Sequence, residues 1–152
     1  MTWELILRIF TAAILGGMIG LEREYRAKEA GFRTHFLVAL GSALFMVVSA
    51  YGFSDAMGAP EQRWDVSRIA AQVVSGIGFI GAGTIIFHKS ENVVRGLTTA
   101  AGVWVTAAIG LACGGGMYAI SIASTILVLA GLEAFNFILR RIYARRDKGS
   151  NP

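Results

Sequence analysis

Five apolar runs, each close to the length of a membrane-spanning helix, set the strongest limit on how this chain can fold. The runs are Glu4–Leu21, Phe36–Phe53, Arg68–Phe87, Leu97–Cys113 and Met117–Leu139. An α-helix needs roughly 20 mostly apolar residues to cross the hydrocarbon core of a bilayer. A spanning segment must also satisfy its own backbone hydrogen bonds, and a barrel would instead show short strands of alternating polarity. The runs therefore predict an all-α integral membrane bundle of five transmembrane helices.

The composition agrees with a lipid environment. Only 16% of the residues are charged, whereas a soluble domain carries about 25%. The chain holds 19 glycines, and glycine is common in membrane helices because it lets neighbouring helices approach closely. Glu4 precedes the first basic residue, so the start lacks the positively charged region of a cleavable signal peptide. The first run is therefore predicted to stay in the membrane as an anchor.

The basic residues give the predicted orientation. Eleven of the 14 Lys and Arg residues lie in Glu22–His35, in His88–Gly96 or after Leu139. Five spans place these three segments on one side of the membrane, and basic loops favour the cytoplasmic side. The N-terminus is thus predicted outside and the C-terminus in the cytoplasm, with a transmembrane domain over residues 1–139 and a basic cytoplasmic tail over 140–152. This topology accounts for the net charge of +4 without a nucleic-acid partner.

The stretch Glu22–Arg33 carries seven charges between two apolar runs. Each acid lies four residues before a base, which is the favourable order on a helix. The pairs are Glu22 with Arg26, Glu24 with Lys28, and Glu29 with Arg33. This spacing predicts that the first helix continues to about Gly31 with its charges paired. The alternative is a Mg²⁺ site on the three carboxylates, but four basic residues outnumber them, and such a site needs uncompensated carboxylates.

Small residues recur at helical spacing in three of the runs. They are Gly16 and Gly20, then Ala71, Ser75, Gly78 and Ala82, and finally Gly102, Thr106, Gly110 and Gly114. Small side chains let membrane helices pack closely, so the favoured interpretation is packing inside one bundle. A homodimer interface and a close-packed pore are the alternatives.

Few strongly polar residues lie inside the runs. They are Arg8, Gln72, Glu133 and Asn136. Arg8 lies near the outer end of its run and is predicted to reach water by snorkelling. Glu133, about two turns before Arg140, has two interpretations that both stay open. An intramembrane carboxylate indicates a functional site by default, and the plainer alternative is an ion pair with an arginine near the cytoplasmic face.

The sequence lacks the motifs of the common enzyme classes. It contains no HExxH, no GxSxG and no P-loop. The segment "GIGFIGAG" superficially resembles a nucleotide-binding loop, but it lies in the middle of an apolar run, with no strand before it and no lysine after it. Packing glycines explain this segment better. We therefore predict a non-enzymatic protein without a cofactor.

The segment "HKSENVVRGLTTAAGVW" joins the second predicted cytoplasmic loop to the fourth run. Asn92 and Arg95 are its polar groups, and Thr98 and Thr99 stand where a helix begins, so their hydroxyls can cap free backbone N–H groups. The segment forms a polar corner suited to contact with an anion or a protein. The simpler interpretation is helix capping plus one arginine of the cytoplasmic side.

Three blocks of the sequence resemble the MgtC/SapB family of bacterial inner-membrane proteins. They are "GGMIGLEREYRAKEAGFRTHFLVALGSALF", "RIAAQVVSGIGFIGAGTIIF" and "VRGLTTAAGVWVTAAIGLACGGGMY", which cover residues 16–118 almost continuously. The resemblance implies a multi-pass domain of five spans in the inner membrane, associated with adaptation to low magnesium and, in some pathogens, with virulence. Positions that match family positions of interest are Glu22, Arg23, Arg26, Arg33, Thr34, Asn92, Arg95, Gly96, Thr98 and Thr99.

The same resemblance implies action through partners in the bilayer, because one branch of the family is linked to restraint of the membrane ATP synthase. We therefore expect a non-enzymatic component of magnesium homeostasis. The alternative is a small Mg²⁺ transporter or channel, with Glu133, Asn136 and Gln72 along its path. Family members tied to virulence carry a soluble domain after the fifth span, whereas this sequence stops at Pro152, so the short form with the membrane domain alone is expected.

Overall fold

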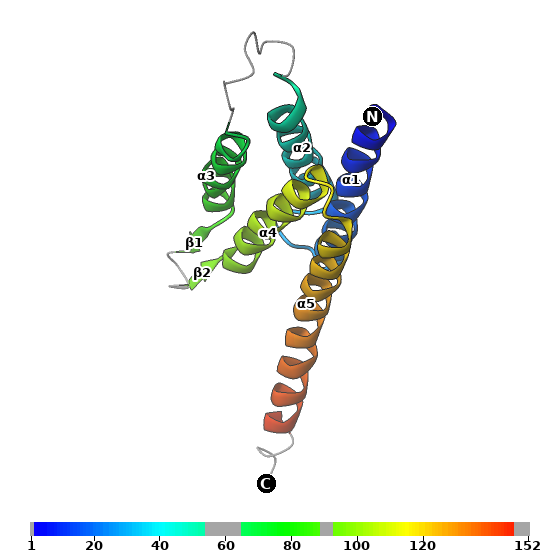
Figure 1. Ribbon diagram of the computed structural model, residues 1–152. Coiled ribbons are helices and arrows are strands. Elements are labelled where there is room, and N and C mark those ends of the chain that lie inside the picture. The colour runs from blue at the N-terminus through cyan, green and yellow to red at the C-terminus, as the bar shows by residue number, and fades with distance from the viewer. Residues whose placement is uncertain (1, 54–64, 89–92, 148–152) are drawn as a thin grey trace.

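The computed structural model of the chain describes residues 2–53, 65–88 and 93–147, which form five helices and one two-stranded hairpin (Figure 1). In chain order the elements are α1 (Thr2–Tyr25), α2 (Phe32–Tyr51), α3 (Ser67–Gly83), β1 (Ile86–His88), β2 (Val93–Arg95), α4 (Leu97–Gly114) and α5 (Tyr118–Asp147). The predicted second and fourth runs correspond closely to α2 and α4. Continuous apolar sequence defined both of these helices well.

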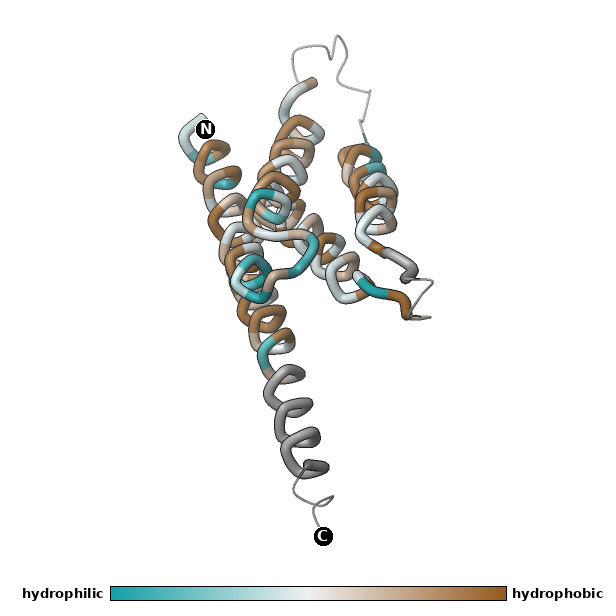
Figure 2. The backbone as a smooth tube through the Cα atoms, turned by 180° about the vertical axis from the view of Figure 1, so that it is seen from behind, coloured by the Kyte–Doolittle hydropathy of each residue, from teal (hydrophilic) through white to brown (hydrophobic). Residues whose placement is uncertain are grey.

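Three of the helices, α1, α2 and α4, are long and apolar enough to cross a membrane. α5 contains a further apolar segment, Tyr118–Ala134, and α3 has 17 residues. Large apolar side chains such as Trp3 and Phe10 on α1 point outward, and brown, apolar residues occupy much of the coloured helices in Figure 2. Apolar surface on this scale requires a hydrocarbon environment. The chain is accordingly a membrane protein.

The core lies where α1, α2 and α4 meet. Its buried residues are Ala12, Leu15, Ile19, Ala39, Ala43, Ile109 and Cys113. Glycines bring the helix backbones together, because a Cβ at Gly16 would strike the carbonyl of His35, and one at Gly110 or Gly114 would strike the carbonyl of Ala39 or Ala43. Two of the three small-residue stripes therefore pack inside one bundle, as the sequence predicted.

The third stripe behaves differently, and the packing prediction is wrong for it. Its members, Ala71, Ser75, Gly78 and Ala82, are all exposed on α3. In this helix only Ile77 and Gly81 are buried, and both lie on a different side of it. α3 therefore stands at the edge of the bundle, packed against α4 and α2 along one face only (Figure 1).

The third run does not remain helical to its predicted end at Phe87. α3 ends at Gly83, and the chain turns at Thr84, whose N–H and hydroxyl both donate to the carbonyl of Gly81. Ile86–His88 then forms β1, which pairs antiparallel with β2. Gly96 follows β2 with a φ of 91° and abuts the carbonyl of Thr84, so a side chain there would be both strained and crowded. The hairpin is the one departure from the all-α prediction within the described residues.

The first helix is also shorter than predicted. α1 ends at Tyr25, not near Gly31, and Ala27 takes a left-handed conformation with a φ of 51°. The N–H of Lys28 donates to the carbonyl of Arg23, and that of Ala27 donates to the carbonyl of Glu24. These two bonds form a Schellman motif, which satisfies the last carbonyls of a helix. At the other end of the chain, α5 continues beyond the predicted Leu139 as far as Asp147.

Candidate functional site

Most of the residues singled out in the sequence meet at one end of the bundle, where α1 ends and α2 and α4 begin. We call this the charged end and define it as residues 22–35 and 95–99 together with Glu133. Segments far apart in the sequence are joined there by side-chain hydrogen bonds and ion pairs. The contacts of each carboxylate establish which helices the charged end holds together.

Glu22 pairs with two arginines. The guanidinium of Arg23 donates to both of its carboxylate oxygens, with Nε 2.5 Å from Oε2 and Nη2 2.8 Å from Oε1. Arg26 Nε lies 3.6 Å from Oε1, so this predicted pair is present. Arg23 is 2% exposed, and a buried guanidinium is stable only when a carboxylate and hydrogen bonds compensate it. Glu22 therefore supports an arginine that faces the interior.

Arg26, the first residue after α1, links the end of that helix to α5. Its Nη2 donates to Oε1 of Glu133, a residue 107 positions further along the chain. This hydrogen bond, more than any other cause, raises the pKa of Arg26 above its usual value. Glu133 thus has an arginine partner, which agrees with the ion-pair interpretation of this carboxylate.

Glu24 caps the start of α2. Its Oε2 accepts a hydrogen bond from the backbone N–H of Phe32 at 2.7 Å. The N-cap residue of α2, Gly31, has no side chain to fill this role. A carboxylate at a helix N-terminus also interacts favourably with the helix dipole. The end of α1 thereby fixes where α2 begins.

Glu29 performs a similar task for α4. Its Oε2 accepts a hydrogen bond at 2.7 Å from the hydroxyl of Thr99, which is 2% exposed in the first turn of α4. Its own backbone N–H, then Thr99, and then the charges of Lys28 and Arg95 hold the pKa of Glu29 below its usual range. The sequence had predicted that Thr99 caps its own helix, whereas its hydroxyl binds a carboxylate from another segment.

Two of the three predicted ion pairs are consequently wrong. Within the described residues, no ion pair joins Glu24 to Lys28 or Glu29 to Arg33. Both pairs required a helix to Gly31, and α1 ends before it. The two carboxylates instead hold the N-terminal turns of other helices.

His35 was missed in the sequence as a member of this site. Its side chain is fully buried, and Nδ1 lies 3.0 Å from the carbonyl oxygen of Gly31. A carbonyl only accepts hydrogen bonds, so Nδ1 carries the proton and Nε2 is left with its lone pair. Nε2 has no hydrogen-bond partner among the described residues and faces Gly102 of α4. A lone histidine at the edge of an apolar run gave no signal of this position.

The other predicted site residues lie on the outside of the charged end. Arg33, Arg95 and Thr98 are exposed, and Thr34 is half-buried. Gly96 forms the turn between the hairpin and α4, and Asn92 lies outside the described residues. The charged end thus contains carboxylates that are bonded to other elements, several of them exposed, and a rim formed by the exposed side chains of Arg33, Arg95 and Thr98. Among the described residues, no group of three or more His, Cys, Asp or Glu side chains is arranged to hold a metal ion.

A second polar cluster lies at the opposite end of the core, around Arg8. Its guanidinium donates to Glu4 at 2.7 Å, to the hydroxyl of Tyr51 at 3.2 Å and to the carbonyl of Gly114 at 3.0 Å. The side chain is only 12% exposed, so it bridges α1, α2 and α4 and does not snorkel. This role leaves no signal in the sequence, because two of the partners lie 43 and 106 residues away.

The sequence is similar to those of known proteins. The model of the MgtC family matches residues 9–141. The chain is 53% identical over 142 residues to the "Putative magnesium transporter YhiD" of Escherichia coli strain K12, covering 93% of this chain and 65% of that protein. It is 44% identical over 140 residues to protein MgtC of Salmonella typhimurium strain LT2, covering 92% of this chain and 54% of that protein.

Protein MgtC of Brucella abortus is 46% identical over 119 residues, which cover 78% of this chain and 46% of that protein. The chain therefore spans about half to two-thirds of the length of these relatives. No solved structure matches the chain.

Proposed function

Because this chain belongs to the MgtC family, we propose that it is a non-enzymatic inner-membrane protein that serves magnesium homeostasis by contacting other membrane proteins. The names of its relatives support the link to magnesium and the membrane. The exposure of Arg33, Arg95 and Thr98 together at the rim of the charged end is the observation that favours action by contact.

The proposed topology has five spans, with the N-terminus outside and the charged end in the cytoplasm. Three helices satisfy the length and apolarity of a span, and α3 and α5 complete the five. α1 and α3 end, and α2 and α4 begin, on the side of the charged end, which fits a chain that crosses the membrane at each helix. Lys28, Arg33 and Arg95 on this side follow the positive-inside rule.

The carboxylates of the charged end are already engaged. Glu22 is paired with arginines, Glu24 with a backbone N–H and Glu29 with Thr99. These contacts hold the helices in position, so we assign the three carboxylates a structural role. The rim, formed by Arg33, Arg95 and Thr98, is exposed to the cytoplasm in this topology and is the proposed contact surface. Cationic and hydroxyl groups suit an acidic surface of a protein partner. The membrane ATP synthase is the first partner to test.

Transport of Mg²⁺ is the second candidate function. The name of YhiD favours it, as does the 55% exposure of Glu133, a carboxylate that is nevertheless paired with Arg26. The side chain of Asn136, the neighbouring polar group on the predicted path, lies outside the described part of the chain. The close contact of α1, α2 and α4 backbones at Gly16, Gly110 and Gly114 argues against a path through the core. A path would then have to run beside α3.

Two measurements separate these functions. The chain is reconstituted in liposomes that contain a Mg²⁺-sensitive dye, and its gene is tested for rescue of a deletion strain at low Mg²⁺. We expect no flux above protein-free liposomes, together with rescue of growth. Flux that disappears in the Glu133→Gln variant would establish transport and refute the proposal.

The rim is tested with matched variants. Arg33→Ala, Arg95→Ala and Thr98→Ala should keep the protein folded and membrane-inserted but reduce rescue. Arg68→Ala is the control, because Arg68 is also exposed but begins α3 at the other end of the bundle. A photo-reactive residue at Thr98 should cross-link a membrane protein that the same residue at Arg68 does not. Full rescue of growth by all three rim variants would refute the proposal that the rim is a contact surface.

A further inference from the structure

α3 differs from the other helices in the face that it turns away from the bundle. α1 presents Trp3, Phe10 and Ile14 outward, each at least 60% exposed, and α5 presents Ile126 and Leu127 in the same way. Large apolar side chains of this kind suit contact with lipid chains. α3 also exposes large apolar side chains, Val74, Phe79 and Ile80, but in addition it carries the exposed stripe of Ala71, Ser75, Gly78 and Ala82.

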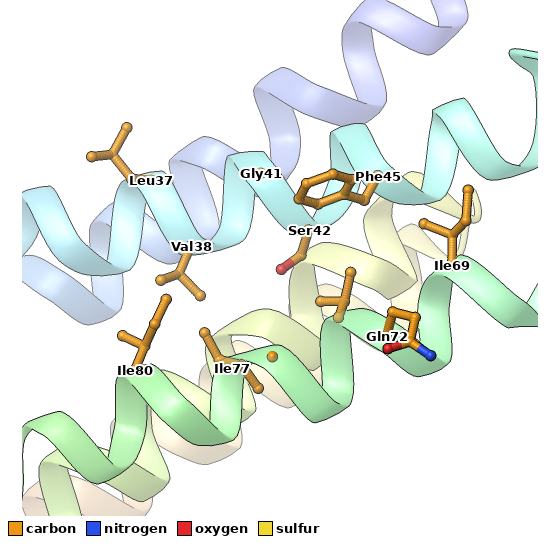
Figure 3. Close-up of a pocket in the computed structure, with 11 residues that line it drawn as sticks. Leu37, Val38, Gly41, Ser42, Phe45, Ile69, Gln72, Ile77 and Ile80 are labelled. Carbon is orange, nitrogen blue, oxygen red and sulfur yellow. The ribbon is translucent and has the colours of Figure 1, made fainter.

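A groove with a volume of about 490 Å³ lies between α2 and α3, on the side of α3 that faces α2, and none of the four stripe residues lines it (Figure 3). It stays open partly because Gly41 of α2 and Gly76 of α3, which both line it, have no side chain to fill the space and no neighbour within 4 Å of where a Cβ would lie. Ile77 and Ile80 form much of its apolar wall (Figure 3). The groove is thus an open apolar space on the α2 side of α3, and Gln72 lies between it and the small-residue stripe.

Gln72 lies in the wall of the same groove (Figure 3). Its amide has no hydrogen-bond partner among the described residues, although it belongs to an apolar helix. An amide in contact with lipid chains loses the hydrogen bonds it would make in water, which is unfavourable. Its presence on an exposed face indicates a partner that supplies a donor and an acceptor.

We infer that this face of α3 binds the same face of a second copy of the chain, forming a twofold-symmetric homodimer in the membrane. A side-chain amide both donates and accepts, so two Gln72 residues that meet across a twofold axis satisfy each other. Small residues beside them let the two helices approach closely enough for this bond.

Phe79 supplies the second half of the contact. It is 86% exposed and lies seven residues after Gln72, so the two side chains share one face of α3 two turns apart. The groove is open at Gly76, one turn from Phe79, on the same molecule. The ring of Phe79 on one copy can therefore enter the groove of the second copy, and the twofold axis repeats this contact in the other direction. Arg68, at the start of α3, lies at the border of the membrane, where its side chain can reach water.

Disulfide cross-linking in native membranes tests this interface. Cys113, the only cysteine of the chain, is buried and is replaced first by serine. Ser75→Cys in this background should form a disulfide-linked dimer on mild oxidation, at a yield at least several times that of Ile14→Cys on the lipid-facing side of α1. Equal yields at the two positions, no dimer at Ser75, or an adduct to a protein of another size would each overturn the proposal.

Two variants test the named contacts. Gln72→Leu and Phe79→Ala should each lower the yield of the Ser75 cross-link, while gel filtration in detergent verifies that the protein is folded. Light scattering should give the mass of two copies for the unmodified chain and a shift toward one copy for each variant. A single copy with phospholipid bound, observed by native mass spectrometry, would instead assign the groove to lipid and refute the dimer.

Discussion

The bundle contains two regions that use small residues in opposite ways. In α1, α2 and α4, glycines bring backbones into contact, and the polar groups Arg8, Glu24 and Glu29 find partners within the chain. In α3, small residues are exposed and the amide of Gln72 lacks a partner among the described residues. The same spacing in the sequence therefore has two structural meanings.

The difference shows that a small-residue stripe does not by itself identify its partner. What separates the stripes is whether they lie on the side of their helix that contacts the neighbouring helices. α1 and α2 are joined by a six-residue connection, residues 26–31, and so pack as neighbours. α3 packs against α4 and α2 through the side that carries Ile77 and Gly81, so its stripe faces away from them. Polar side chains differ in the same way. Those of α1 and its connection to α2 have partners within the chain, whereas Gln72 of α3 has none among the described residues.

Bulky substitution of glycine should give the largest contrast. Gly110→Leu places a side chain against the carbonyl of Ala39 and the side chain of Ser42, and overpacking of this kind costs about 1–3 kcal/mol or more. We expect most of this variant to be lost from the folded, membrane-inserted fraction measured by gel filtration in detergent. Gly78→Leu meets open space in the single chain, so the variant should fold but lose the Ser75 cross-link. If Gly110→Leu and Gly78→Leu lost equal amounts of folded protein, the small residues of α3 would be packed as closely as those of the core, and the comparison would be wrong.

How much of this could be predicted depends on the range of the interactions. Continuous apolar sequence defined α2 and α4, and glycine spacing indicated packing at Gly16 and Gly110. The end of α1 was misplaced because its Schellman turn uses Ala27 where glycine would have been the usual signal. The end of α3 had a usable signal, since Gly83 and the β-branched Ile85 disfavour a continuing helix.

The site was less predictable than the fold. Spacing correctly paired Glu22 with Arg26, which lie one helical turn apart. Glu29 and Thr99 are separated by 70 residues, and Arg26 and Glu133 by 107. Only the tertiary structure brings such residues together. Local spacing could suggest only nearby partners, such as Arg33 for Glu29. His35 gave no pattern at all, because its burial depends on Gly102 of another helix.

Loss of the Arg8 side chain tests the polar half of the comparison. Arg8→Met removes three hydrogen bonds, two of which join α1 to α2 and to α4, and we expect a loss of about 2–3 kcal/mol in the free energy of unfolding in detergent. Arg68→Met, at the exposed start of α3, is the matched control and should change stability by less than about 0.5 kcal/mol. A similar loss in both variants would show that Arg8 adds no more than an exposed arginine does.

The Glu29–Thr99 contact should make stability depend on pH. Because Glu29 binds its proton less readily in the folded chain, its contribution is complete above the unfolded pKa of 4.5 and is lost as the pH falls through the lower folded value. Thr99→Val should cost about 1 kcal/mol near neutral pH and flatten the fall in stability below pH 4.5. Thr98→Val, whose side chain is exposed, should leave the pH profile unchanged. If Thr99→Val left the dependence of stability on pH unchanged, the Glu29–Thr99 hydrogen bond would not contribute to holding α4 in place.

The smallest expected effect concerns the turn that ends α1, and its sign is opposite to the others. Ala27 holds a φ of 51°, where an L-residue with a side chain is disfavoured by roughly 1–2 kcal/mol. Ala27→Gly relieves this strain but enlarges the freedom of the unfolded chain, so we expect a net gain of up to about 1 kcal/mol in unfolding free energy. Ala71→Gly on the exposed face of α3 should instead lose up to about 1 kcal/mol, because it lies within a regular helix. If both variants had a lower free energy of unfolding than the unmodified chain, the left-handed turn at Ala27 would carry no strain. Glycine would then act at the end of α1 as it does within α3.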